Sequence, residues 1–340
     1  MLRRIEFPSR ISACSSLGPV SFLFIKNRMI RPRLYPTQQI PALNMNIFRL
    51  LKFISEHPVN EGQALRAMTR FIKWQISSRL APGAIVYDWI NGARFLVRTG
   101  ETGLTGNIYT GLHEFADMGY LLHTLRSEDN FVDIGANLGS YTVLAGAVVG
   151  ASGQSFEPIP ATYSKLVENI RINHIEGRMS AFNIGLGEKV GAIRFTSDLD
   201  TVNHALSEDE NSISSVIVDV TTLDIALKDI QPNFIKIDVE GYETQVLKGA
   251  AKTINNANLH SVIMELNGSG SRYGFDEKDI LTMMLDAGFS TFSYDPIFRK
   301  LTNLNGKNRL SGNTIFIRDQ ALVRDRIHSA PKFRIFDRDI

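Results

Sequence analysis

From residue 131 onward, short apolar runs alternate with longer stretches in which apolar residues recur at helical spacing. The apolar runs have strand length and lie at 131–134, 153–157, 179–184, 233–238, 260–266, 289–294 and 312–318. The helical stretches lie at 138–149, 161–173, 242–255 and 275–287. Strands that alternate with helices predict βαβ units in a doubly wound, mostly parallel α/β sheet. No helix separates the last two runs, and such a short connection permits antiparallel pairing.

The region before this alternation carries a different pattern. Residues 45–80 and 112–126 show helical spacing, and two short strand-like runs at 84–87 and 93–98 flank Asn91-Gly92, a two-residue hairpin signal. We therefore expect an N-terminal unit of helices and a hairpin over residues 45–126, packed on a core domain over residues 127–320. Within the core, Gly191 to Thr196 and the polar stretch 197–215 are expected to form an insertion, and residues 321–340 a C-terminal tail.

The first 44 residues differ from the rest of the chain. They hold five of the twelve prolines and seven Arg or Lys residues against one acid, Glu6. An acid-poor, arginine-rich start can be a transit peptide, but Arg10 and Pro19 interrupt the pattern and no clean cleavage site follows. The plainer interpretation is a disordered extension, or an upstream start codon with Met45 as the true beginning.

Composition narrows the class of protein without naming it. An apolar fraction of 44% and a charged fraction of 21% are those of an ordinary soluble globular protein. A net charge of +2 gives no reason to expect nucleic acid as a partner, and no apolar run approaches the roughly 20 residues of a membrane helix. The single cysteine, Cys14, excludes an intrachain disulfide and fits a cytoplasmic location.

The first candidate site is the stretch FVDIGANLGSYT, residues 131–142. Asp133, Gly135, Asn137 and Gly139 follow an expected strand, at the sheet edge where open α/β sheets bind ligands. Glycines let a ligand approach the backbone, and the helix that begins near residue 138 offers free N–H groups. A tight turn without a ligand is the simpler alternative for this loop alone.

A second acid favours a bound cofactor at this loop, and two loop residues then separate the candidate cofactors. Glu157 ends the second strand 22 residues after Gly135, where a carboxylate can accept both hydrogen bonds from a ribose diol. A nicotinamide site needs a glycine where Asn137 stands, and Asp133 would repel pyrophosphate but would attract the ammonium of an amino acid tail. No phosphate-binding loop with the G-x-x-x-x-G-K-[ST] pattern is present. The loop therefore suits S-adenosylmethionine.

Several motifs of the chain occur in the same order as in the FkbM family of S-adenosylmethionine-dependent methyltransferases, which the chain therefore resembles. The resemblance covers roughly residues 105–318 and rests on VDIGANLGSYT, FEP, NIGLGE at 183–188, TLD at 222–224 and IKIDVEGYETQVLKGA at 235–250. It implies a class I methyltransferase (Rossmann-like) fold of seven strands with the last one antiparallel. It also implies O-methylation, often of sugars or polyketide hydroxyls.

The resemblance adds cofactor residues outside the glycine loop. Asn183 and Gly185 belong to the shared NIGLGE motif and are expected beside the cofactor. Glu114 matches a glutamate of the family and either contacts the amino acid end of the cofactor or caps the helix that follows.

The acceptor side is expected at the ends of the fourth and fifth strands. Asp238 and Glu240 follow the fourth strand and can bind a divalent ion, hold the substrate or cap the helix that begins near Tyr242. We expect Asp238 to orient the acceptor or the cofactor and assign no metal ligand. Glu265 and Asn267 follow the fifth strand in a glycine-rich loop and are candidates for binding a hydroxylated acceptor.

A general base is needed because a sugar hydroxyl is a weak nucleophile. His204 stands in the polar insertion beside Asn203, and a histidine can accept a proton near neutral pH. Similar LDTVNH-like stretches accompany the core in the family subgroup that the chain resembles. We therefore expect His204 to be the base and Asn203 to contact the substrate, with His113 as the competing base and a solvated loop histidine as the structural alternative.

The sequence thus predicts a cytoplasmic S-adenosylmethionine-dependent O-methyltransferase acting on a small-molecule or glycan hydroxyl, expected on a sugar. Its partners include neither nucleic acid nor a membrane span, and a homo-oligomer is left open. Two alternatives remain, a nicotinamide-dependent oxidoreductase and a methyltransferase-like binding module without activity.

Overall fold

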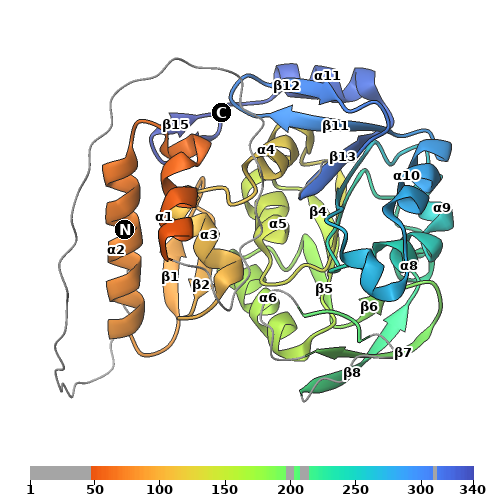
Figure 1. The fold of residues 1–340 in the computed structure, drawn as a ribbon, viewed down its shortest axis with the longest axis horizontal. Helices are drawn as coiled ribbons and strands as arrows, with labels where there is room; N and C mark the ends of the chain where they lie inside the picture. Colours follow the sequence, from red (N-terminus) through yellow and green to blue (C-terminus); the bar gives the residue numbers. More distant parts are fainter. Residues whose placement is uncertain (1–46, 197–202, 207–213, 309–311) are drawn as a thin grey trace.

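The computed structural model describes residues 47–196, 203–206, 214–308 and 312–340, and its centre is one large twisted sheet (Figure 1). The strand order is β12-β11-β13-β10-β9-β3-β4-β5, with β13 antiparallel to both of its neighbours and the strands from β10 to β5 parallel. The strands are β3 (Asn130–Ile134), β4 (Ser152–Phe156), β5 (Met179–Phe182), β9 (Phe234–Ile237), β10 (Ser261–Glu265), β11 (Ser290–Asp295), β12 (Lys300–Asn303) and β13 (Asn313–Ile317). The expected parallel sheet with an antiparallel last strand is confirmed.

Helices cover both faces of the sheet, as the near-continuous apolar runs of its strands require. Alternate residues of β3 show this, because Phe131 packs into one buried cluster and Val132 into another on the opposite face. The helices of the core are α4 (Phe115–Thr124), α5 (Ser140–Val143) with its π-helical continuation η2 (Leu144–Val149), α6 (Pro160–Ile172), α7 (Leu223–Leu227), α8 (Glu243–Lys248), α9 (Ala251–Ile254), η4 (Ser269–Tyr273), α10 (Glu277–Asp286) and α11 (Gln320–Ser329). No helix in the described ranges is long and apolar enough to cross a membrane.

The N-terminal elements pack as a layer beside the sheet (Figure 1). They are α1 (Ile47–Glu56), η1 (Pro58–Asn60), α2 (Ala64–Leu80), β1 (Ile85–Asp88), β2 (Arg94–Val97) and α3 (Thr102–Thr110). The hairpin signal is confirmed, since Asn91 and Gly92 have φ values of +49° and +84° between paired strands. Phe95 and Leu104 of this layer share a buried cluster with Leu138 of the core.

A smaller sheet of β6 (Gly185–Leu186), β8 (Ser215–Thr221) and β7 (Gly191–Thr196) lies beside the core. It contains the expected hairpin strand at 191–196, and the partner of that strand is β8. Most of the polar insertion between them lies outside the described residues, as do residues 1–46 with the expected extension.

The large sheet has eight strands and not the expected seven. The additional strand, β12, forms because Asp295 accepts hydrogen bonds from the N–H groups of Ile297 and Phe298, at 3.0 and 3.1 Å, and turns the chain back. Residues after 320, expected to be a tail, form α11 and the short hairpin of β14 (Arg334–Ile335) and β15 (Arg338–Asp339).

A buried ion pair ties α11 to the core. The guanidinium of Arg326 approaches both carboxylate oxygens of Asp129, at 2.5 and 3.1 Å, just before β3 begins. Asp129 is 3% exposed, and the same carboxylate accepts the N–H of Arg126 at 2.8 Å. The C-terminal helix is thus part of the folded domain.

We expect Asp129→Asn to lower the free energy of unfolding by about 3–5 kcal/mol, because it leaves the Arg326 charge buried without its partner. Urea denaturation checks this value. The matched control is Lys278→Ala, which removes an exposed ion pair with Asp276 and should cost less than about 1 kcal/mol. Equal effects of the two substitutions would contradict the structural role of α11.

Candidate active site

A cavity of about 250 Å³ lies at the carboxyl ends of β3, β4 and β9. The chain runs from β3 to β4 on one side and reaches β9 on the other, so the cavity lies where the strand order reverses, the usual ligand site of such sheets. Its lining includes Asp133, Gly135, Asn137, Glu157 and Gly185 from the expected cofactor set, together with Glu114, Asn203, Asp238 and Glu240.

The glycine loop is held tightly against the neighbouring strand. Gly135 has a φ of +75°, and a Cβ atom there would lie 1.8 Å from the carbonyl oxygen of Asp238. Only glycine fits this approach. Gly139 caps the start of α5 and does not line the cavity, so its role differs from that of Gly135.

Asp133 is the buried acid at the base of the loop. It is 2% exposed, and one carboxylate oxygen accepts the Thr142 hydroxyl at 2.6 Å. Burial raises the pKa of Asp133 to about 6, and among the described residues no basic side chain forms an ion pair with it. A cationic group in the cavity would therefore find an acid whose ionised form it stabilises.

Glu157 directly follows β4 and forms the wall of the cavity there. Its carboxylate accepts the N–H groups of Asn137 and Ile159, at 3.0 and 2.9 Å, which fixes its orientation. Burial raises the pKa of Glu157 to about 7. The amide of Asn183 donates to the carbonyls of Glu157 and Pro158, so Asn183 supports this wall from outside the cavity lining.

Glu114 does not cap the helix that it precedes, which resolves one of the alternatives above. Its carboxylate accepts the Tyr141 hydroxyl at 2.7 Å and the Asn313 amide at 2.8 Å. The side chain therefore points to the core of the site, and burial together with this carboxylate raises the pKa of Tyr141.

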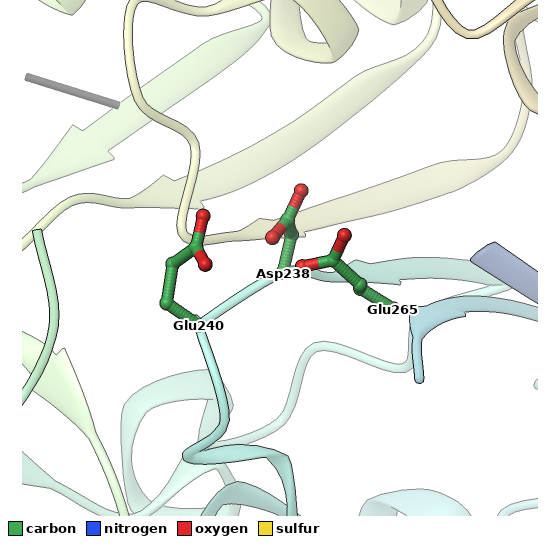
Figure 2. Close-up of side chains that lie close together, drawn as sticks. All are labelled: Asp238, Glu240 and Glu265. Atoms are coloured by element: carbon green, nitrogen blue, oxygen red, sulfur yellow. The ribbon is translucent and has the colours of Figure 1, made fainter. Parts of the chain in front are cut away.

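Asp238, Glu240 and Glu265 come together just beyond the carboxyl end of β9 and at that of β10 (Figure 2). One carboxylate oxygen from each lies within 4.8 Å of the others. Asp238 also accepts the ammonium of Lys236 at 2.9 Å. Burial and the neighbouring carboxylates raise the pKa of both Glu240 and Glu265.

Among the described residues no side chain caps the start of α8, so helix capping, one alternative for Glu240, is wrong. Glu243 accepts the N–H groups of Val239 and Gly241, both at 3.2 Å, ahead of α8. The backbone of Glu240 has a φ of +54°, and Gly241 has a φ of +102° with the Ser269 backbone close by. This turn leaves the Glu240 carboxylate beside Asp238 and Glu265.

Of the residues expected on the acceptor side, His204, Glu265 and Asn267 do not line the cavity. Asn203 lines it and accepts the Thr196 hydroxyl at 3.1 Å, whereas the adjacent His204 is buried outside the lining. The competing base His113 does line the cavity, and burial lowers its pKa. Asn267 is exposed and accepts the Ser269 N–H in its own loop.

Lys236 lines the cavity, although the sequence motifs did not single it out. It is 1% exposed, and its ammonium lies 5.1 Å from the centre of the Tyr141 ring. The available signal was a lysine inside an apolar strand, two residues before Asp238 and so on the same face. A buried lysine needs acids around it, and they are the acids of this site.

Known proteins resemble this chain mainly over the same region. Residues 133–291 match the Methyltransferase FkbM domain. The hexuronic acid methyltransferase AglP of Haloferax volcanii is 30% identical over 173 residues, which are 50% of this chain and 67% of that protein. Methyltransferase 1 of Beauveria bassiana is 30% identical over 159 residues, which are 40% of this chain and 64% of that protein.

Among solved structures, a methyltransferase FkbM from Methylobacillus flagellatus KT shares 18% identity, with a TM-score of 0.42 over 63% of this chain and 52% of that one. The domain match and the identity to AglP establish the family. The chain is a member of the FkbM methyltransferase family.

Proposed function

We propose that this methyltransferase uses S-adenosylmethionine to methylate a hydroxyl group, with a sugar as the acceptor. The observation that carries the proposal is one cavity lined by two groups of polar side chains. Asp133, Asn137 and Glu157 lie in and beside the glycine loop, and Asp238 and Glu240 follow β9.

The acids beside the glycine loop fit the cofactor. Asp133 is buried next to the glycine loop and forms no ion pair among the described residues, so it would bind the ammonium of the methionyl group. Glu157 keeps unused lone pairs on both oxygens after accepting two backbone N–H groups, and they would take the ribose hydroxyls. When bound, S-adenosylmethionine supplies an electrophilic methyl group on a sulfonium.

The acids that follow β9, Asp238 and Glu240, suit a polyhydroxylated acceptor. Carboxylates accept hydrogen bonds from hydroxyls and can hold the reacting oxygen in line with the methyl group, and this positioning supplies much of the rate. The related AglP acts on a hexuronic acid by its name, which supports a sugar acceptor here. The nicotinamide alternative is disfavoured because Asp133 stands where pyrophosphate would lie.

The cofactor assignment is tested by S-adenosylhomocysteine binding. Asp133→Asn should weaken binding about 10- to 100-fold, because one charge-assisted hydrogen bond of about 1.5–3 kcal/mol is lost. In the unaltered protein, affinity should rise between about pH 5 and 7 as Asp133, with its pKa of about 6, becomes ionised. Isothermal titration calorimetry measures both effects.

The control for this titration is Glu176→Gln, an exposed acid far from the cavity lining. Its affinity and pH dependence should equal those of the unaltered protein. In Asp133→Asn, the affinity should rise less with pH, and only through the ionisation of Glu157, whose pKa is about 7. Unchanged affinity in Asp133→Asn would refute the ammonium site.

The acceptor class is tested by mass spectrometry of reaction mixtures that contain S-adenosylmethionine and single sugars. Hexuronic acids, neutral hexoses and glycans that contain them should include an acceptor that gains one methyl group on oxygen. Products methylated on nitrogen or carbon, or NADH binding in place of S-adenosylmethionine, would contradict the proposal.

The base assignment compares two histidines. His204→Ala should lower kcat about 100-fold or more, the usual contribution of a general base, while S-adenosylhomocysteine affinity stays nearly unchanged. His113→Ala is the matched comparison, because His113 lines the cavity. A loss of kcat in His113→Ala alone would move the base to His113.

A further inference from the structure

The carboxylates of Asp238, Glu240 and Glu265 converge because of the strand register. Parallel β9 and β10 place Lys236 beside Ile263 and Ile237 beside Met264. The next residues along, Asp238 and Glu265, therefore end neighbouring strands at the same level. The left-handed turn at Glu240 then returns a third carboxylate to the same point (Figure 2).

Glu265 is the unusual member of this group. It is 2% exposed, and its Oε2 atom is buried with no hydrogen-bond partner in the described part of the chain. Figure 2 shows its carboxylate directed at that of Asp238. A buried acid with an unpartnered oxygen costs free energy, and a bound ion is one of the partners that remove this cost.

The basic groups nearby do not satisfy the cluster. Lys236 contacts Asp238 through Oδ2 only, which leaves Oδ1 available. Arg272 faces Glu240 but donates to its backbone carbonyl, at 3.4 Å. Three carboxylates thus share one buried ammonium, and Glu114 and Asp133 add further acid on the same face of the sheet.

We propose that Asp238, Glu240 and Glu265 form a binding site for a divalent cation with hard oxygen preference, such as Mg²⁺ or Mn²⁺. The donor set contains only carboxylate oxygens, with no thiolate or imidazole to select zinc. Oxygen ligands of one Mg²⁺ lie about 3 Å apart when adjacent and about 4.2 Å apart when opposite, so the three carboxylates, now within 4.8 Å of one another, would draw together around the ion.

The position of this ion gives it a role that rests on the proposed function. Asp238 and Glu240 line the cavity after β9, where the acceptor is expected, so the ion would lie beside the acceptor. There it would ligate the hydroxyl oxygen of the sugar and lower the pKa of that hydroxyl. The proton then passes to the general base, and the metal changes neither charge nor oxidation state.

The test is a titration of the chelator-treated, dialysed protein with MnCl₂, followed by electron paramagnetic resonance of free Mn²⁺ and by calorimetry. The unaltered protein should show one saturable site. Glu265→Gln and Glu240→Gln should each weaken it at least about 10-fold, because each removes one charged ligand. The control Glu176→Gln changes an exposed acid outside the cluster and should bind Mn²⁺ as the unaltered protein does.

S-adenosylhomocysteine binding, measured on the same samples, separates this inference from the proposed function and confirms that the variants are folded. Two results would overturn the metal site alone, provided that the proteins still bind S-adenosylhomocysteine. One is an unaltered protein without a saturable Mn²⁺ site, and the other is an unchanged Mn²⁺ affinity in both variants. Loss of cofactor binding in the unaltered protein would overturn the proposed function, while a Mn²⁺ site lost in the two variants would still support the metal site.

Discussion

The buried ammonium of Lys236 is the interaction on which the rest of the site depends. Its Nζ atom lies 2.9 Å from Asp238 and beneath the ring of Tyr141, and the acids Glu114 and Glu265 surround it. These acids raise the pKa of Lys236, so the ammonium stays charged although it is 1% exposed. A buried charge of this kind persists only where opposite charges compensate it.

This arrangement follows from strand alternation. On β3 and β9, Asp133 and Lys236 are register partners, and both point to the face that α4 and α5 cover. Glu265 occupies the same face at the end of β10, paired with Asn313 of the antiparallel strand β13. The antiparallel last strand therefore contributes to the site, since Asn313 holds Glu114 in place.

The carboxylates at and near the cavity fall into two groups, according to the hydrogen bonds that they already accept. Glu157 is oriented by two backbone N–H groups, and Asp133 by a threonine hydroxyl, so both are fixed before a ligand arrives. Glu240 and Glu265 have no comparable backbone donors in the described residues. Glu157 and Asp133 are therefore positioned to bind the cofactor before it arrives. Glu240 and Glu265 need a further ligand, such as the proposed cation.

Much of the fold could be predicted because the strands are buried on both faces and appear as continuous apolar runs. Glycines at 103 and 106 hid α3, and β12 forms through a turn made by Asp295, which no apolar pattern marks. The strand-end acids were predicted because their position depends on local order alone. The role of Lys236 depends on contacts with distant segments, those of Tyr141 and Glu114.

The most direct measurement of the central claim is a crystal structure of the protein with S-adenosylhomocysteine. The account predicts the ribose hydroxyls within hydrogen-bond distance of Glu157, the ammonium beside Asp133, and the sulfur directed to the end of the cavity that Asp238 and Glu240 line. A ligand bound outside this cavity, or bound with its ribose away from Glu157, would contradict the account.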